Sequence, residues 1–147
     1  MPAGIGARTG TPGRIALIAL ALLAVVAAAT WYALEADGVA IIETARGDAG
    51  LRRTHVWFVR DGDAVLLEAG SPDNGWYRDI RTTKRLRIVE PAAIAGECVP
   101  DVLANPDGHA DIRARLRAQY GWRDAWIGLL FDTSRSLAVR CRAVGSG

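Results

Sequence analysis

The longest hydrophobic stretch of the chain runs from Ile15 to Leu34 and contains no charged residue. At about 1.5 Å per residue, a helix over this stretch spans roughly 30 Å, which is the thickness of the apolar core of a bilayer. The stretch has no polar face to meet water, which disfavours a helix packed on a soluble domain. The pattern therefore predicts one transmembrane helix over residues 15–34, preceded by a basic N-terminal arm over residues 1–14.

The charges that flank this stretch predict its orientation. Arg8 and Arg14 precede it, whereas Glu35 and Asp37 follow it. By the positive-inside rule, the N-terminus is cytoplasmic and the rest of this single-pass protein is extracytoplasmic. Small residues at positions 27–29 also match the cleavage site of a signal peptide, which is the alternative. We favour the membrane anchor because the apolar stretch continues beyond position 29.

Shorter patterns after Glu35 predict a mainly β domain of the α+β class over residues 35–147. Alternating or β-branched runs indicate strands, a spacing of four residues between apolar positions indicates helices, and Asp61-Gly62-Asp63 indicates a tight hairpin. Six short strands with late helices are typical of a small barrel with helices at its side. The strands are expected over residues 39–45, 52–60, 64–69, 86–90, 94–99 and 136–144, and the helices over 76–83, 110–120 and 122–131.

The charge balance of the domain argues against nucleic acid as a partner. Of the 18 Lys and Arg residues in the chain, only Arg8 and Arg14 precede Glu35, so that 16 remain beside 16 Asp and Glu. A domain that binds nucleic acid through its overall charge would be net basic. The formal charge of +2 therefore belongs to the N-terminal arm.

Four motifs occur in an order that resembles a known family. They are Arg53-Thr54 in a strand, Arg60–Asp63 in a hairpin, Ala69–Ser71 after the next strand, and Gly75–Ile80 at the start of a helix. In this order they resemble the deazaflavin (F420)-dependent nitroreductase and quinone reductase family, which is similar to the FMN-binding split β-barrels of the pyridoxamine-phosphate-oxidase type. The segment from Tyr120 to Asp132 resembles the tail of a membrane-anchored subgroup.

The resemblance implies a split β-barrel that holds F420 or FMN and passes hydride to a small oxidised acceptor, such as a quinone or a nitro compound. Split barrels of this type often form homodimers, and the sequence leaves the oligomeric state open. The cofactor performs the chemistry in such enzymes, so we assign no catalytic side chain. Basic and hydroxyl groups would bind the phosphate, small residues would lie along the ring, and an aromatic pair would lie beside it. These residues are, respectively, Arg52, Arg53 and Thr54, with Arg53 the preferred arginine; Ala69, Gly70 and Ser71; and Trp76 and Tyr77.

A second function from a different class stays open. The acidic Asp48 lies in the turn from Thr44 to Gly50, where the family carries basic and glycine residues. A carboxylate disfavours phosphate at this position. The alternative is therefore a split-barrel binding or interaction module at the membrane that has lost its cofactor.

The cysteines and histidines do not predict a metal site. His55, His109, Cys98 and Cys141 lie far apart, without the spacing of metal ligands. An extracytoplasmic domain permits a disulfide between Cys98 and Cys141, whereas a reducing compartment would leave two small buried thiols. The sequence leaves both possibilities open.

Overall fold

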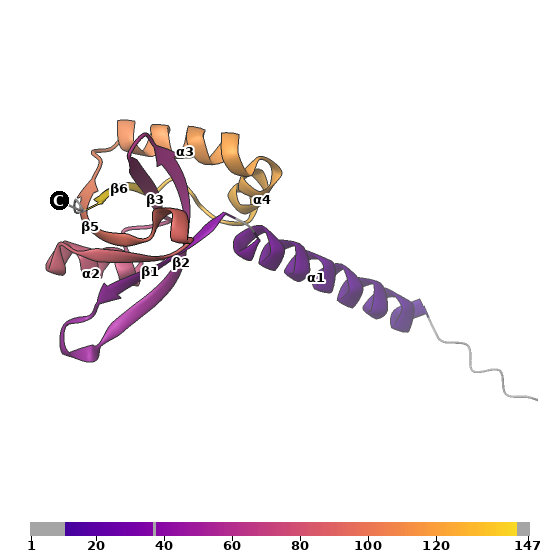
Figure 1. Ribbon diagram of the computed structural model, residues 1–147. Helices are drawn as coiled ribbons and strands as arrows, with labels where there is room; N and C mark the ends of the chain where they lie inside the picture. The colour runs from indigo at the N-terminus through magenta and orange to yellow at the C-terminus, as the bar shows by residue number, and fades with distance from the viewer. Residues whose placement is uncertain (1–10, 37, 144–147) are drawn as a thin grey trace, which may run out of the picture. The chain divides into compact units, whose positions relative to one another are not determined.

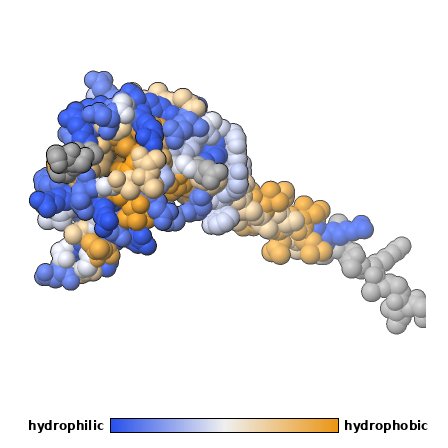
Figure 2. All heavy atoms as spheres, viewed as in Figure 1, coloured by the Kyte–Doolittle hydropathy of each residue, from blue (hydrophilic) through white to orange (hydrophobic). Residues whose placement is uncertain are grey.

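The computed structural model describes residues 11–36 and 38–143 (Figure 1). Its contacts divide the chain into a unit that ends at Tyr32 and a unit that starts at Ala33. Helix α1 (Thr11–Glu35) supplies all the described residues of the first unit, and its last three residues belong to the second unit. The helix begins four residues before the predicted start. Apolar residues gather along this helix in Figure 2. From Pro12 to Glu35 it is long and apolar enough to cross a membrane, although a signal sequence has the same properties.

The second unit is an antiparallel barrel of six strands with flanking helices, as predicted. Neighbouring strands pair in the closed order β1-β2-β3-β6-β5-β4. Its elements are β1 (Val39–Ala45), η1 (Gly47–Ala49), β2 (Leu51–Asp61), β3 (Ala64–Ala69), α2 (Gly75–Thr83), β4 (Leu86–Glu90), η2 (Ala92–Ile94), β5 (Gly96–Val102), α3 (Asp107–Tyr120), α4 (Trp122–Leu130) and β6 (Leu137–Ala143).

Most observed elements agree with the predicted ranges to within a few residues. The clearest difference is β5, predicted over residues 94–99 and observed from Gly96 to Val102. Residues 92–94 form a short 3-10 turn, and the strand continues further because its pairing with β6 extends to Val102 opposite Val139. The predicted end of the last strand, residue 144, lies outside the described residues.

Strand β2 divides the apolar residues between two cores. Val56 and Phe58 face the interior of the barrel, where Trp76 and Ile80 of α2 also pack. Trp57 and Val59 face outward and pack against α3 and α4. Successive side chains of a strand point to opposite faces, so one strand contributes to both cores. The two cores therefore follow from the alternation of side-chain directions along β2.

Tyr120, at the end of α3, joins the helical layer to the barrel. Its ring stacks on Trp57 with 4.6 Å between the ring centroids. Its hydroxyl accepts the N–H of Phe58 at 3.2 Å and lies 2.5 Å from the carbonyl oxygen of Gly38, to which it can donate. Burial raises the pKa of Tyr120 above its ordinary value, so the phenol stays neutral and remains a donor at physiological pH.

A buried ion-pair cluster fastens α3 to β3 and α4. Arg113 donates to Glu68 at 2.7 Å and also to Asp124, while Arg117 donates to Asp124 at 2.7 Å. The Asp124 side chain is fully buried, whereas that of Arg117 is 65% exposed. Buried charges need such partners because transfer from water into the protein interior costs each of them free energy.

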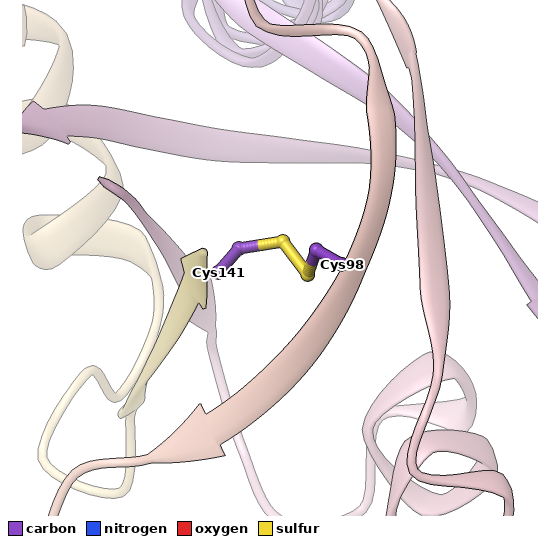
Figure 3. Close-up of a disulfide and its surroundings, with 2 residues drawn as sticks. All are labelled: Cys98 and Cys141. Carbon is purple, nitrogen blue, oxygen red and sulfur yellow. A yellow bond between two sulfur atoms is a disulfide. The ribbon is translucent and has the colours of Figure 1, made fainter. Parts of the chain in front are cut away.

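A disulfide links β5 to β6 inside the barrel (Figure 3). Cys98 and Cys141 lie on neighbouring strands with their Cα atoms 5.5 Å apart, and both are buried in the barrel core. Of the two states that the sequence leaves open, the structure contains the disulfide.

Candidate functional site

The candidate site lies where strands β2 and β3 part. Their pairing runs from Asp61 opposite Ala64 to Phe58 opposite Leu67. Beyond this point β2 continues against β1, and β3 continues against β6. A cavity of about 530 Å³ has walls from both parted segments, Thr54–Trp57 on one side and Glu68, Gly70 and Ser71 on the other. Its volume is in the range of small-molecule and cofactor sites.

The remaining walls come from three further parts of the second unit. Asn74 and Trp76 belong to the start of α2, and residues 127 and 131–133 belong to α4 and the loop after it. Leu34 and Glu35 contribute from the last turn of α1, which belongs to this unit. The cavity therefore combines aromatic and aliphatic surfaces with a few polar groups, as ligand sites commonly do.

Four of the eight predicted site residues line this cavity: Thr54, Gly70, Ser71 and Trp76. Ala69 and Tyr77 adjoin two of them in sequence, but both are buried in the barrel core. Ser71 is held in place locally, because its hydroxyl accepts the N–H of Asp73 at 3.1 Å. The structure thus brings the strand, loop and aromatic parts of the predicted site together.

Arg52 lies against the beginning of α2 and not in the cavity wall. Its Nε atom donates to Asp79 at 2.8 Å, and the Thr44 hydroxyl donates to the same carboxylate oxygen at 2.8 Å. A Cβ atom on Gly75 would lie 2.6 Å from the Arg52 guanidinium carbon. Glycine at position 75 therefore permits the guanidinium to lie beside the helix N-terminus.

Arg53 has a different environment. Its side chain is 60% exposed, and its Nε atom lies 3.1 Å from a carboxylate oxygen of Glu43 on β1. Arg52 and Arg53 follow each other along a strand, so their side chains point to opposite faces of the sheet. The alternation places Arg52 on the face of Thr54, and Arg53 on the face of His55.

The cavity also contains polar side chains that the sequence analysis did not select. His55 Nδ1 lies 2.5 Å from Glu35 Oε2, and both residues line the wall. The indole Nε1 of Trp57, another wall residue, is buried and has no hydrogen-bond partner among the described residues. The alternation in β2 puts His55 and Trp57 on one face, but no local signal indicates that this face borders a cavity.

Acidic groups outnumber basic ones in the cavity wall. Glu35, Glu68 and Asp132 line it together with His55. Hydrogen bonds from Ser134 hold the pKa of the exposed Asp132 below its ordinary value, so this carboxylate is charged at neutral pH. The negative charge of Glu68 is paired with the guanidinium of Arg113, 2.7 Å away. Asp48, in the turn that departs from the family pattern, is exposed and does not line the cavity.

Comparisons with known proteins give similarity in structure alone. No family model matches the chain, and a search of curated proteins finds no significant match. A conserved hypothetical protein from Mycobacterium tuberculosis has a TM-score of 0.59 at 13% identity, over 81% of this chain and 79% of the other. HutZ, the heme storage protein of Vibrio cholerae, has a TM-score of 0.58 at 10% identity, over 78% and 87%.

A third similar solved structure is that of a protein known to bind a flavin. A FAD-binding protein from Mesorhizobium loti has a TM-score of 0.55 at 12% identity, over 81% of this chain and 90% of the other. At such low identity the likeness concerns the fold. The chain therefore shares the barrel fold of proteins that include a FAD-binding protein and a heme storage protein.

Proposed function

We propose that the second unit binds a flavin-type cofactor, F420 or FMN, in the cavity between β2 and β3 and transfers hydride to a small oxidised acceptor of the quinone or nitro type. The observation that carries this proposal is the position of Thr54, Gly70, Ser71 and Trp76. These residues, selected through the family resemblance, line one cavity where two barrel strands part. The FAD-binding protein of the same fold supports a cofactor of this chemical type.

The polar groups of the cavity fit a planar ring with carbonyl groups. A buried donor without a partner costs about 1–3 kcal/mol. Trp57 lines the cavity and its indole N–H has no partner among the described residues, so a ligand acceptor that reached this group would recover that cost. The edges of parted strands also present backbone N–H and C=O groups. Trp76 also borders the cavity, but only 2% of its surface is exposed, so it can contribute no more than a small aromatic contact to a bound ring.

The phosphate of the cofactor is assigned in this proposal to Arg52. Its Nε atom is engaged by Asp79, whereas its two Nη groups make no hydrogen bond within the described residues. They lie beside Gly75, at the N-terminal end of α2, where backbone N–H groups favour an anion. This geometry moves the preference from Arg53, which lies on the other face of β2 beside Glu43.

The cofactor supplies the hydride chemistry when it is bound, and the chain binds and orients it. In this proposal Trp57 would donate a hydrogen bond to the cofactor, Arg52 would bind its phosphate, and Ile127 and Phe131 would restrict water at one wall. His55 and Glu35, 2.5 Å apart in the same wall, are placed to hold a proton at the imidazole Nδ1. Reduction of a quinone by hydride also consumes a proton, which this pair can relay.

Cofactor binding is tested by titration of the full chain in lipid nanodiscs. Quenching of cofactor or tryptophan fluorescence by F420 and by FMN should give saturable curves at micromolar concentrations. Absence of saturation with either compound at tens of micromolar would remove the proposal.

Replacing Trp57 with phenylalanine should weaken cofactor binding about tenfold, because one hydrogen bond is lost while the stack on Tyr120 remains. The measurement is the dissociation constant in the same titration. Trp122→Phe is the matched control, since Trp122 is 56% exposed and does not line the cavity. Equal affinities of the two variants would contradict the role of the Trp57 indole.

Replacing Arg52 with glutamine should weaken FMN binding by about tenfold or more, because a charge-assisted hydrogen bond to phosphate is lost. Riboflavin, which lacks the phosphate, should bind the variant and the native chain equally. Arg53→Gln is the matched control and should leave the FMN affinity within about twofold, as expected for an exposed charge. If Arg53→Gln lowered the FMN affinity more than Arg52→Gln, the phosphate would instead be assigned to Arg53.

A second candidate function is a binding module without cofactor. Its support is electrostatic, because Arg52 and Arg53 both pair with carboxylates and three acidic residues line the cavity. These charges disfavour an anionic cofactor. The same titration separates the two functions, since a module without cofactor would bind neither FMN nor F420.

We also propose that α1 anchors the protein in a membrane with the second unit extracytoplasmic. The length and composition of α1 support the anchor, and the Cys98–Cys141 disulfide supports an oxidising compartment. Resistance of the chain to sodium carbonate washing tests the anchor. An alkaline phosphatase fusion at the C-terminus tests the side of the membrane, and an inactive fusion would place the domain in the cytoplasm.

A further inference from the structure

The end of α4 exposes three consecutive apolar side chains, Leu129, Leu130 and Phe131, which we call the α4 tip. They are 77%, 42% and 52% exposed, respectively. Side chains of this size are normally exposed singly, and a contiguous group on the surface indicates an interaction site. We propose that the α4 tip inserts into the surface of the bilayer that α1 crosses, and this inference rests on the proposed anchor.

The contacts of α4 identify the bilayer as the occupant. Arg123, in the first turn of α4, donates to the carbonyl oxygens of Ala33 at 2.9 Å and Ala36 at 3.0 Å. Both acceptors belong to the second unit and lie where α1 ends. Helix α4 is therefore fixed beside the point at which the apolar stretch leaves the membrane.

A shared cavity wall brings the α4 tip to the same place. Phe131 of the tip and Leu34, the last residue of the uncharged stretch, both line the cavity. Leu34 is itself 39% exposed. If α1 spans the bilayer as far as Leu34, then Phe131 lies within one cavity width of the membrane surface. The tip therefore lies close to the residues of the second unit at which the apolar stretch ends.

The chemistry of the tip predicts which lipids it requires. The three side chains are uncharged, and the next residue, Asp132, is an exposed carboxylate. Burial of apolar surface, and not attraction to anionic headgroups, therefore drives the insertion. Insertion should occur in a bilayer of phosphatidylcholine alone.

The proposed position of the α4 tip also gives a lipophilic acceptor a route into the cavity from the membrane. Ile127 and Phe131 form part of the wall at the end of α4. With the tip in the bilayer surface, this wall faces lipid, and a lipophilic acceptor dissolved in the membrane can reach the cavity without crossing bulk water. This route accommodates a quinone with a long apolar tail.

The test places an environment-sensitive probe at the tip. The full chain with Leu129→Cys is labelled with an NBD maleimide and reconstituted into phosphatidylcholine vesicles, while both native cysteines stay in their disulfide. Leu51→Cys is the matched control, because Leu51 is also apolar and 64% exposed but lies at the start of β2. NBD at position 129 should emit at shorter wavelength, and doxyl-labelled lipids should quench it several times more strongly than at position 51.

The alternatives give different results. Water-like emission at position 129 in carbonate-resistant protein would overturn insertion of the α4 tip and leave the anchor intact. A blue shift without quenching by doxyl lipids, dependent on protein density, would show a second copy on the tip and would also overturn it. Release of the native chain by carbonate would overturn both the anchor and the insertion of the α4 tip. The flavin titration is independent of all three results.

Discussion

Replacing Arg113 with methionine should lower the free energy of unfolding by about 4 kcal/mol, because the change leaves buried carboxylates without their shared cation. Arg113 contacts both Glu68 and Asp124, and the exposed fractions of these acidic side chains are 11% and 0%. Methionine retains most of the side-chain volume, so the lowered free energy of unfolding measures the loss of the positive charge and not the opening of a cavity. The measurement is urea unfolding of the full chain in nanodiscs, followed by tryptophan fluorescence.

Arg117→Met is the matched control for this prediction. Arg117 contacts the same Asp124, but its side chain is 65% exposed, so the loss should be below about 1 kcal/mol. Combining Arg113→Met with Glu68→Gln and Asp124→Asn removes the uncompensated charges and should recover much of the stability. Equal losses in the two single variants, or no recovery in the triple variant, would contradict the account of the cluster.

The sequence predicts the fold well where a pattern is local. The alternation of side-chain directions along β2 puts Val56 and Trp57 on opposite faces of the strand, and the structure places them in two different cores. The spacing of Ile112, Leu116 and Tyr120 likewise predicts the buried face of α3. Each of these signals depends only on the period of one strand or helix.

The candidate site depends on relations between elements, which no single pattern contains. Strand β2 has the same alternation on both sides of Phe58, although its partner changes there. The partners of charged residues are equally distant, since Glu35 lies 20 residues before His55. Asp124 has the sequence context of an exposed helical carboxylate, yet it is fully buried because α3 brings two arginines to it. The cofactor residues themselves came from the family resemblance.

Removing the disulfide should also have a large effect on stability. In the loop-entropy description, a link between residues 43 positions apart contributes about 4 kcal/mol by restricting the unfolded chain. The variant Cys98→Ala/Cys141→Ala should unfold at correspondingly lower urea concentration, measured by tryptophan fluorescence in nanodiscs. The fold itself should persist, because β5 and β6 remain paired from Val99 opposite Arg142 to Val102 opposite Val139.

The native chain after reduction separates the covalent link from the packing of the sulfur atoms. Both cysteine residues are 3% exposed in the folded domain, so reduction of the disulfide requires transient unfolding and is carried out in urea before refolding. If restriction of the unfolded chain carries the effect, the reduced native chain should lose nearly as much stability as the double alanine variant. Reduced protein as stable as the oxidised form would contradict that account. It would also remove the disulfide as an argument for an oxidising compartment, because the domain would then fold equally well with free thiols in the cytoplasm.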